Sequence, residues 1–291
     1  MVNQRLQTEK IVIIGCGRAG TGLARIFARH GNMVTGVYDK NEEKAENLVK
    51  NRIAEKVLPG LAEIPADVTV LFIAVQDRYI SGVAESLARS EGSFDSDVIF
   101  AHLSGVLSAG EVFPGVKEEL SFCSFHPCMT FSGNETVEGG FSIAIEGDEQ
   151  GANRLKLLAE AIDCRPFLMA PEDKTLYHAA CVMASNYFVV LMYLAEELLS
   201  GMKSESGINT LIPLVKTTLA NIESQGTHSA LSGPVSRGDV DTLKKHLAEL
   251  RKKAPGTVNA YMELAKKSAE IAGDLPTGQK TRLRQLFSDT L

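Results

Sequence analysis

The sequence predicts an α/β fold, in which a doubly wound sheet is followed by an all-α C-terminal domain. Short β-branched runs alternate with helical stretches in the first half of the chain, a pattern typical of parallel strands covered by helices. From Asp173 onward the pattern is purely helical. At roughly 100 to 200 residues per domain, the 291 residues indicate two domains, which we place at 1–171 and 172–291.

The elements follow in chain order. KIVIIG, at residues 10–15, is a β-branched run that ends in glycine, and helical spacing follows it as far as Gly31, a suitable C-cap. The other predicted strands cover 33–39, 68–77, 97–105, 141–147 and 165–170, with helices near 41–55, 78–90 and 149–162. Later helices are predicted near 207–225, 239–253 and 256–272.

The longest predicted helix begins after Asp173, a candidate N-cap, and runs to about Leu199. It is apolar almost all round, which predicts that it forms the buried core of the second domain. Its most apolar run, residues 179–195, is shorter than the roughly 20 residues that cross a bilayer and carries Ser185 and Asn186 at its centre. We therefore expect a buried helix and no membrane partner.

Composition narrows the class of partner. The net charge is −6 and no block of Lys or Arg is present, which argues against nucleic acid and anionic membranes and favours a small-molecule substrate. The N-terminal residues lack the features of a signal peptide, so a cytoplasmic location is expected. The five cysteines form no C-x-x-C pair, which fits reduced thiols without disulfides.

A glycine motif, GCGRAG, lies directly after the first predicted strand and opens a helix. Gly15 permits the tight turn, Gly17 lets a pyrophosphate approach the backbone, and Gly20 lets helix and strand pack closely. Asp39 ends the next strand, where a carboxylate can accept from ribose hydroxyls. This arrangement indicates a Rossmann-type site for NAD or NADP.

The choice between the two cofactors stays open at this point. Asp39 repels a 2′-phosphate and slightly favours NAD, whereas Arg18 and Lys40 offer positive charge that accommodates one. Ala19, inside the glycine motif, and Val75, in the third predicted strand, complete the expected cofactor contacts.

The stretch SFHPCMTF, residues 124–131, places His126 before Pro127. Histidine transfers protons near neutral pH, and the following proline restricts its backbone, so a catalytic or substrate-binding role is favoured. A structural turn is the main alternative. A metal site with Cys123, His126 and Cys128 is disfavoured because no fourth ligand cluster is apparent.

Other candidates come from one strand end, one helix face and one loop. Ser104, in HLSG, follows a strand and either binds substrate or forms a turn, while His102 is expected to be a core histidine with a polar partner. At about 100° per residue, Lys174, His178, Cys181 and Ser185 share one helix face, which we expect to face a cleft, although burial is nearly as plausible for His178.

Arg237 lies in the loop SGPVSRGD. Its guanidinium suits a substrate carboxylate, and a solvated loop arginine is the alternative. Asp239 is expected to cap the next helix, on which Thr242 and His246 lie one turn apart.

Five segments carry a resemblance that covers nearly the whole chain: HLSG, FHP, IEGD, YHAACVMASNY and GPVSRGDVDTLKKH. They resemble the bacterial family with an N-terminal Rossmann-like domain and a C-terminal domain of unknown function 2520, in which some related proteins are thought to act as ketopantoate reductases. More distantly, the chain resembles the superfamily of pyrroline-5-carboxylate reductase, prephenate dehydrogenase and 6-phosphogluconate dehydrogenase. That superfamily implies a homodimer through the helical domain.

The resemblance also suggests residue roles. Prephenate dehydrogenases have a serine after the corresponding strand and a catalytic His-Pro step, which Ser104 and His126 match, whereas Asn186 replaces the histidine of their Ser-His pair. Hydroxyacid dehydrogenases use a lysine and an asparagine on the equivalent helix, so Lys174 and Asn186 are expected to donate to the substrate.

These features together predict an NAD(P)-dependent oxidoreductase that acts on a small 2-oxo or 2-hydroxy acid, with a ketopantoate-like substrate as the specific hypothesis. His126 or Lys174 would supply the proton, Ser104 and Asn186 would orient the carbonyl, and His178 and Arg237 would bind substrate. The alternatives are a prephenate- or pyrroline-carboxylate-type enzyme and a dinucleotide-binding regulator without turnover.

Overall fold

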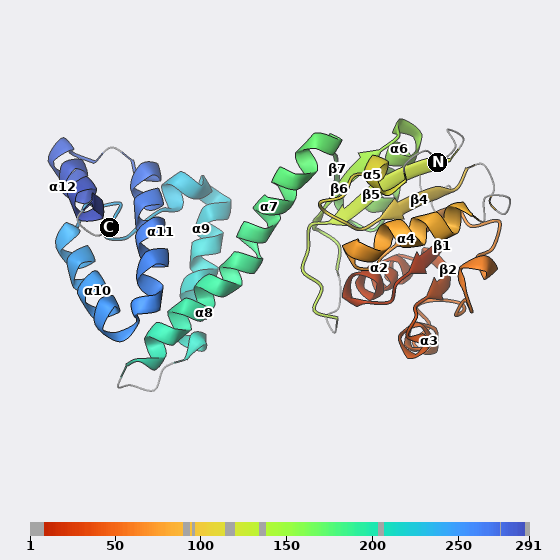
Figure 1. Cartoon of the computed structure of the whole chain (residues 1–291), viewed down its shortest axis with the longest axis horizontal. Helices are drawn as coiled ribbons and strands as arrows, with labels where there is room; N and C mark the ends of the chain where they lie inside the picture. The colour runs from red at the N-terminus through yellow and green to blue at the C-terminus, as the bar shows by residue number, and fades with distance from the viewer. Residues whose placement is uncertain are drawn as a thin grey trace. The chain divides into compact units, whose positions relative to one another are not determined.

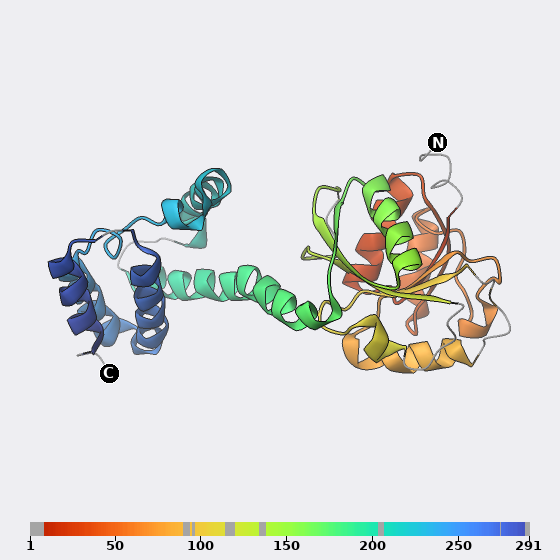
Figure 2. The ribbon, with the colours of Figure 1, turned by 90° about the horizontal axis from the view of Figure 1, so that it is seen from above.

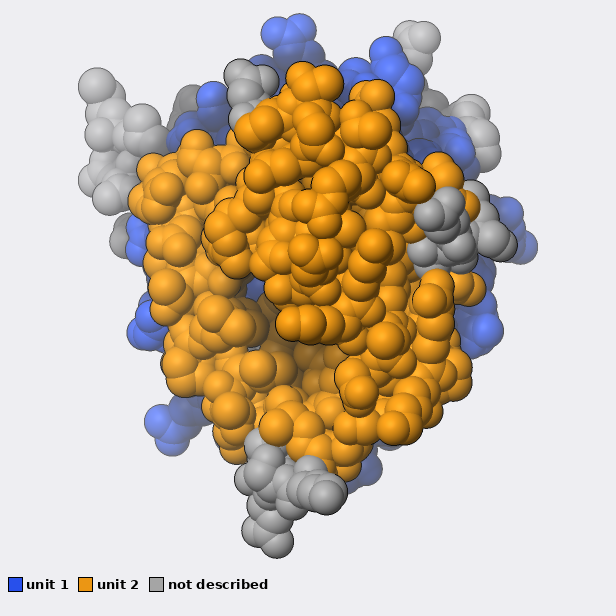
Figure 3. Space-filling view, turned by 90° about the vertical axis from the view of Figure 1, so that its left-hand side faces the viewer, with its two compact units in different colours: residues 1–185 blue, residues 186–291 orange. Residues whose placement is uncertain are grey.

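A computed structural model describes residues 9–89, 94, 97–113, 120–133, 138–202, 207–273 and 275–288. The chain divides into two compact units, residues 1–185 and 186–291 (Figure 3). The division falls after Ser185, later than the boundary at residue 171 that the sequence suggests. The first half of the long apolar stretch therefore belongs to the first unit.

The first unit contains a seven-stranded sheet in the order β2-β1-β3-β4-β5-β6-β7 (Figure 1). The strands are β1 (Lys10–Ile14), β2 (Met33–Tyr38), β3 (Val70–Ile73), β4 (Ile99–His102), β5 (Ser121–Pro127), β6 (Ser142–Gly147) and β7 (Arg165–Leu168). Neighbouring strands are parallel except β5 and β6, which are antiparallel. The doubly wound sheet is confirmed, with this one reversal.

The strand β5 corrects one expectation from the sequence. His126 and Pro127 lie in this strand and pair with Ala144 and Ile143 of β6, so the His-Pro step is not a turn. Within the described part of the connection between β5 and β6 there is no helix, and an antiparallel pair needs no helical crossover.

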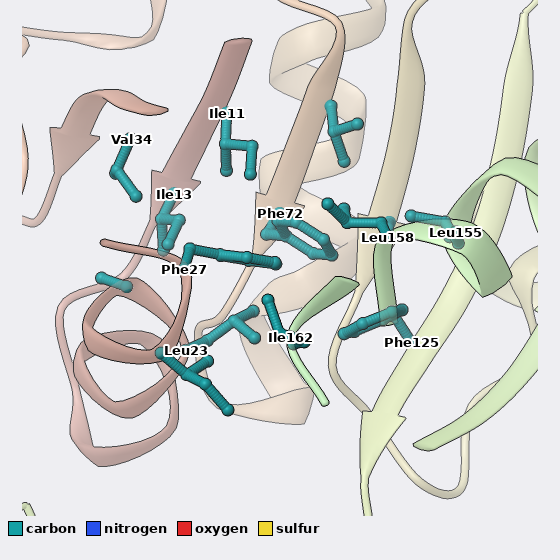
Figure 4. Packing of buried hydrophobic residues seen from close by; sticks show 14 of the residues in the cluster. Ile11, Ile13, Leu23, Phe27, Val34, Phe72, Phe125, Leu155, Leu158 and Ile162 are labelled. Atoms are coloured by element: carbon teal, nitrogen blue, oxygen red, sulfur yellow. The ribbon is translucent and has the colours of Figure 1, made fainter. Parts of the chain in front are cut away.

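Helices cover both faces of the sheet. Figure 2 shows α2 (Arg18–Arg29) and α6 (Glu149–Ala161) on one face and α4 (Asp77–Ala88) and α5 (Ala109–Val112) on the other; α3 (Glu42–Lys50) packs beside β2. On the first face, Phe72 lies between Phe27 and Phe125, with ring centroids 5.5 and 5.2 Å away (Figure 4). This packing fixes the strand ends that carry the site.

The predicted long helix is two helices, α7 (Lys174–Ala184) and α8 (Asn186–Ser200), separated at Ser185. Asp173 precedes α7 but its side chain makes no capping hydrogen bond, because it already lies in the short 3-10 turn Pro171–Asp173. Asp173 therefore occupies the expected N-cap position but does not cap the helix through its side chain.

The expected burial of this stretch is also wrong for the single chain. Lys174 is the one buried residue of α7, and α8 has none. By length and composition alone, the described stretch Pro171–Ser200 is able to cross a membrane. This differs from the expectation that the apolar run at residues 179–195 is too short. The core helices of soluble proteins meet the same criteria. A helix that is apolar on all sides is expected to be buried against another surface, but the sequence pattern does not show which surface that is.

The second unit has its core elsewhere. It continues with α9 (Ile212–Ala230), α10 (Val240–Lys253), α11 (Val258–Ile271) and α12 (Thr277–Ser288), the last of which the sequence pattern did not predict. The buried cluster includes Val240, Leu243, Leu247, Met262 and Leu283, from α10, α11 and α12. Asp239 caps α10 by accepting from the Thr242 backbone N–H at 3.1 Å, as expected.

Candidate active site

The glycine motif forms a tight turn between β1 and α2. Gly15 has a φ of +101°, and a Cβ there would lie 2.7 Å from the Ala74 carbonyl oxygen. A Cβ on Gly20 would lie 1.9 Å from the carbonyl oxygen of Gly15. A Cβ on Gly17 would meet nothing within 4 Å, so the space in front of the α2 N-terminus is open. The first N–H groups of α2 can therefore receive phosphate.

A cleft of about 650 Å³ adjoins this turn. Gly15, Gly17, Asp39, Lys40 and Val75 all line it, so five of the predicted cofactor residues come together. The structure adds Lys44, Ala74, Arg78 and Tyr79 to the lining. Lys44 belongs to α3, Ala74 follows β3, and Arg78 and Tyr79 belong to α4. These residues line the same cleft as Asp39 because only β1 lies between β2 and β3 in the sheet.

Three predicted cofactor residues do not line this cleft. Arg18 is exposed, and a Cβ on Gly133 would lie 3.5 Å from its Cγ, so Arg18 extends along the segment that follows β5. Ala19 and Gly20 lie in the first turn of α2. Gly20 serves packing, as predicted, whereas Arg18 does not line the cleft.

His126 lies near the carboxyl end of β5. Its Nδ1 is 2.9 Å from the Tyr177 hydroxyl, and its ring lies 6.0 Å from that of His178. A Cβ on Gly105 would approach His126 Nε2 to 2.8 Å and His178 Cδ2 to 2.7 Å, so the Gly105 backbone lies against both rings. Burial, together with the neighbouring His178 and Lys174, lowers the pKa of His126 to about 4. The ring is neutral at pH 7.

Ser104 has its hydroxyl fully engaged by the protein. The hydroxyl donates to Asp77 at 3.0 Å and accepts from the backbone N–H groups of Val106 and Leu107 at 3.2 and 3.1 Å. One donor and two lone pairs are all that a hydroxyl offers. This geometry matches the turn-forming alternative. The backbone N–H of Ser104 donates to Nδ1 of His102, which is buried as expected of a core histidine, whereas its Nε2 is buried without a hydrogen-bond partner among the described residues.

Lys174 is buried with a carboxylate that the sequence analysis did not assign. Its Nζ donates to the Ser124 hydroxyl at 2.5 Å and to the Ser104 carbonyl at 3.3 Å, and lies 3.9 Å from Glu146. The side chains of Lys174 and Glu146 are 1% and 4% exposed. Burial lowers the pKa of Lys174 and raises that of Glu146. The ammonium therefore faces protein atoms, not the cleft.

The polar face of α7 lies against β5 and the segment that follows it. The Sγ atoms of Cys181 and Cys128 are 3.7 Å apart, and the hydroxyls of Ser185 and Thr130 are 3.0 Å apart. With His178 beside His126, the four predicted residues do share one face, but Lys174, Cys181 and Ser185 are used for packing. Tyr177, the partner of His126, was not predicted from the sequence because it lies beside this helix face and not on it.

Strand geometry argues against a metal site formed by Cys123, His126 and Cys128. Cys123 belongs to the buried core cluster, and alternation along β5 places it on the opposite face from His126. Among the described residues, no group of three His, Cys, Asp or Glu side chains is placed to bind a metal ion. All five cysteines are free thiols in the structure.

Asn186 and Arg237 belong to the second unit. Asn186 begins α8 and Arg237 precedes α10, and both are exposed. In the same unit, the Thr242 hydroxyl donates to Asp239 at 2.7 Å and His246 Nδ1 lies 2.8 Å from the Tyr261 hydroxyl. The roles of Asn186 and Arg237 at the substrate stay predictions.

Comparison with known families agrees with this architecture. A Rossmann-like domain model matches residues 2–127, and the model of the domain of unknown function DUF2520 matches residues 141–268. The chain joins a Rossmann-like domain to a DUF2520 domain. The resemblance drawn from the five sequence segments is thereby confirmed.

Among the solved structures with the same fold, three match this chain over almost their entire length. A candidate NADP oxidoreductase of Bacteroides fragilis is 24% identical, with 91% of this chain and 99% of that chain covered and a TM-score of 0.77. A Thermotoga maritima protein is 28% identical, with 90% and 98% covered and a TM-score of 0.71. The pyrroline carboxylate reductase of Plasmodium falciparum, solved with NADP bound, is 12% identical, with 92% and 100% covered and a TM-score of 0.59. No curated protein sequence matches the chain.

Proposed function

We propose that this DUF2520 protein is an NAD(P)-dependent oxidoreductase that interconverts a small 2-oxo acid and its 2-hydroxy acid, with a ketopantoate-like substrate. One observation carries the proposal. The parallel strands β2, β1, β3, β4 and β5 end at one edge of the sheet, and Asp39, Gly15, Val75, Gly105 and His126 follow or end them in that order. A dinucleotide pocket and a histidine therefore share the edge where ligands bind in such sheets.

The residues that would hold the cofactor fit it well. The open space at Gly17 and the α2 N-terminus suit the pyrophosphate, and the cleft beyond Asp39 suits the adenosine. A bound nicotinamide dinucleotide supplies the hydride in one direction and accepts it in the other.

His126 is the group that we assign to proton transfer. When its Nδ1 donates to Tyr177, Nε2 keeps a free lone pair on the side of Gly105. The neutral ring can take the hydroxyl proton of a 2-hydroxy acid. A carboxylate substrate that binds beside the ring would raise its pKa towards the ordinary value, so the same residue can return the proton during reduction.

Lys174 takes a positioning role in this proposal. Because its ammonium contacts the Ser104 carbonyl and Ser124, it holds the segment that carries Gly105 against His126. Ser104, bonded to Asp77, fixes the same segment from the other side. His178, Asn186 and Arg237 are proposed to bind the substrate carbonyl and carboxylate.

We further propose that the protein is a cytoplasmic homodimer that joins through its helical unit. Large apolar side chains are exposed on α8 and α9 in the single chain, among them Tyr187, Val189, Val190, Tyr193, Leu214 and Leu219. Large groups of exposed apolar side chains often mark protein–protein interfaces. Light scattering of the purified chain should give twice the 31.4 kDa mass of one copy, and a monomer at micromolar concentration would refute the dimer.

A substrate panel tests the activity. NADPH and NADH oxidation at 340 nm is followed with 2-oxo acids, including ketopantoate, and with cyclic imines and prephenate in the appropriate direction. We expect turnover with a branched 2-oxo acid. Turnover confined to pyrroline carboxylate would favour the alternative that the fold of the Plasmodium enzyme suggests. Tight dinucleotide binding without turnover on any of these compounds would point to a regulator.

A further inference from the structure

The ribose end of the cofactor cleft is strongly basic. Three cationic side chains, those of Lys40, Lys44 and Arg78, line the cleft, and Asp39 is the one acidic residue in its lining. The whole chain carries a net charge of −6, so this positive corner runs against the overall charge. Within the described residues, none of the three cations forms a salt bridge with a carboxylate. An anionic ligand would neutralise them.

Asp39 offsets one of these three positive charges, and backbone donors hold its carboxylate. One oxygen accepts from the Cys16 N–H at 2.6 Å, inside the glycine turn, and the other accepts from the Asn41 N–H at 2.8 Å. The carboxylate thus ties the end of β2 to the turn after β1. Its repulsion of a nearby phosphate is reduced because two N–H dipoles point at it.

Tyr79 provides a surface between the cations. The Arg78 guanidinium lies 4.7 Å from the centroid of the Tyr79 ring, and Lys40 Nζ lies 5.8 Å from it. Tyr79 is 49% exposed, so part of its side chain is open to solvent in the cleft. Both cations lie over the ring as cation–π contacts, so Tyr79 holds Arg78 and Lys40 close to each other, where one phosphate could contact both.

The pyrophosphate does not account for these cations. The N-terminus of α2 beside Gly17 would receive the pyrophosphate, whereas Lys40, Lys44 and Arg78 come from the segment after β2, from α3 and from α4. Arg18, the cation nearest the glycine turn in sequence, lies outside the lining. A second, separate anion explains the basic corner best.

We propose that this site selects NADP(H) over NAD(H), with Arg78 and Lys40 binding the 2′-phosphate of the adenosine ribose and Tyr79 stacking on the adenine. The proposal rests on the dinucleotide binding proposed above. It replaces the slight preference for NAD that Asp39 alone suggested, since Asp39 acts here as a positioning residue for the glycine turn.

Calorimetric titration of the full chain tests the proposal without any substrate. NADPH, NADH, adenosine 2′,5′-bisphosphate and ADP are titrated into the wild type, Arg78→Ala, Lys40→Ala and the matched control Lys156→Ala, which removes an exposed cation on α6. We expect NADPH to bind at least ten times more tightly than NADH, and adenosine 2′,5′-bisphosphate more tightly than ADP. Charge-assisted hydrogen bonds predict that Arg78→Ala weakens NADPH binding about 10- to 100-fold more than NADH binding.

The outcomes separate the two proposals. Equal affinities for NADPH and NADH, or an Arg78→Ala variant that weakens both alike, would overturn the 2′-phosphate site and leave the oxidoreductase proposal intact. Absence of binding by both dinucleotides would overturn the oxidoreductase proposal together with this one. The NADPH affinity should also fall more steeply with salt than the NADH affinity, because a doubly charged phosphate is screened.

Discussion

Replacing Lys174 by methionine should destabilise the protein strongly. The change leaves Glu146, which is 4% exposed, with one remaining donor among the described residues, the Ala109 N–H at 2.9 Å. It also removes the donor to the Ser104 carbonyl and to Ser124. Breaking a buried ion pair from one side costs about 3–5 kcal/mol, because the other charge stays buried without its partner. We therefore expect Lys174→Met to lower the free energy of unfolding by about that amount.

Urea unfolding followed by circular dichroism measures the loss, and a double-mutant cycle identifies its cause. Glu146→Met alone should also be costly, whereas Lys174→Met combined with Glu146→Met should recover a large part of the loss, because the double variant buries no unpaired charge. The buried pair would not be the element that holds the Ser104–Gly105 segment if a single variant lost less than about 1 kcal/mol in free energy of unfolding. The same conclusion would follow if the loss in the double variant equalled the sum of the two single losses.

Three further predictions follow from the geometry. Burial lowers the folded-state pKa of His102 to about 3. The contribution of this neutral histidine to the free energy of unfolding is fully present above its unfolded pKa near 6.5 and is lost as pH falls towards 3, with about 2 kcal/mol lost at pH 5. Urea midpoints that do not change between pH 7 and 5 would contradict this. Gly105→Ala should abolish turnover but keep dinucleotide affinity in calorimetry, since its Cβ would meet both histidine rings. Gly20→Ala should abolish dinucleotide binding, because its Cβ would clash with the Gly15 carbonyl; normal binding would show that the turn is not rigid.

Local sequence patterns predicted the part of the site that lies on consecutive elements. The turn from β1 to α2 contains Gly15, Gly17 and Gly20 within one short segment, so spacing alone located it. Asp39 was found for the same reason, because it ends the next strand along. His126 was found from its chemistry, although the strand that holds it was not predicted, since β5 pairs with β6 through a long-range antiparallel contact.

The partners of these residues were not predictable because they come from distant parts of the chain. Tyr177 reaches His126 from α7, and Asp77 reaches Ser104 from the start of α4. Lys174 was expected to contact substrate, but whether an ammonium faces a cleft or a buried carboxylate depends on where Glu146 lies in the folded sheet. Helical periodicity likewise indicated an apolar α8 without indicating which surface covers it.

The most direct test of the central claim is the rate of hydride transfer with and without the imidazole of His126. NADPH oxidation at 340 nm is compared for the wild type and His126→Ala, with the 2-oxo acid that gives the highest turnover and with dinucleotide affinity checked by calorimetry. Loss of a positioned proton-transfer group predicts a fall of about 10²- to 10⁴-fold in kcat with cofactor affinity retained. Turnover at the wild-type rate in His126→Ala would contradict the account.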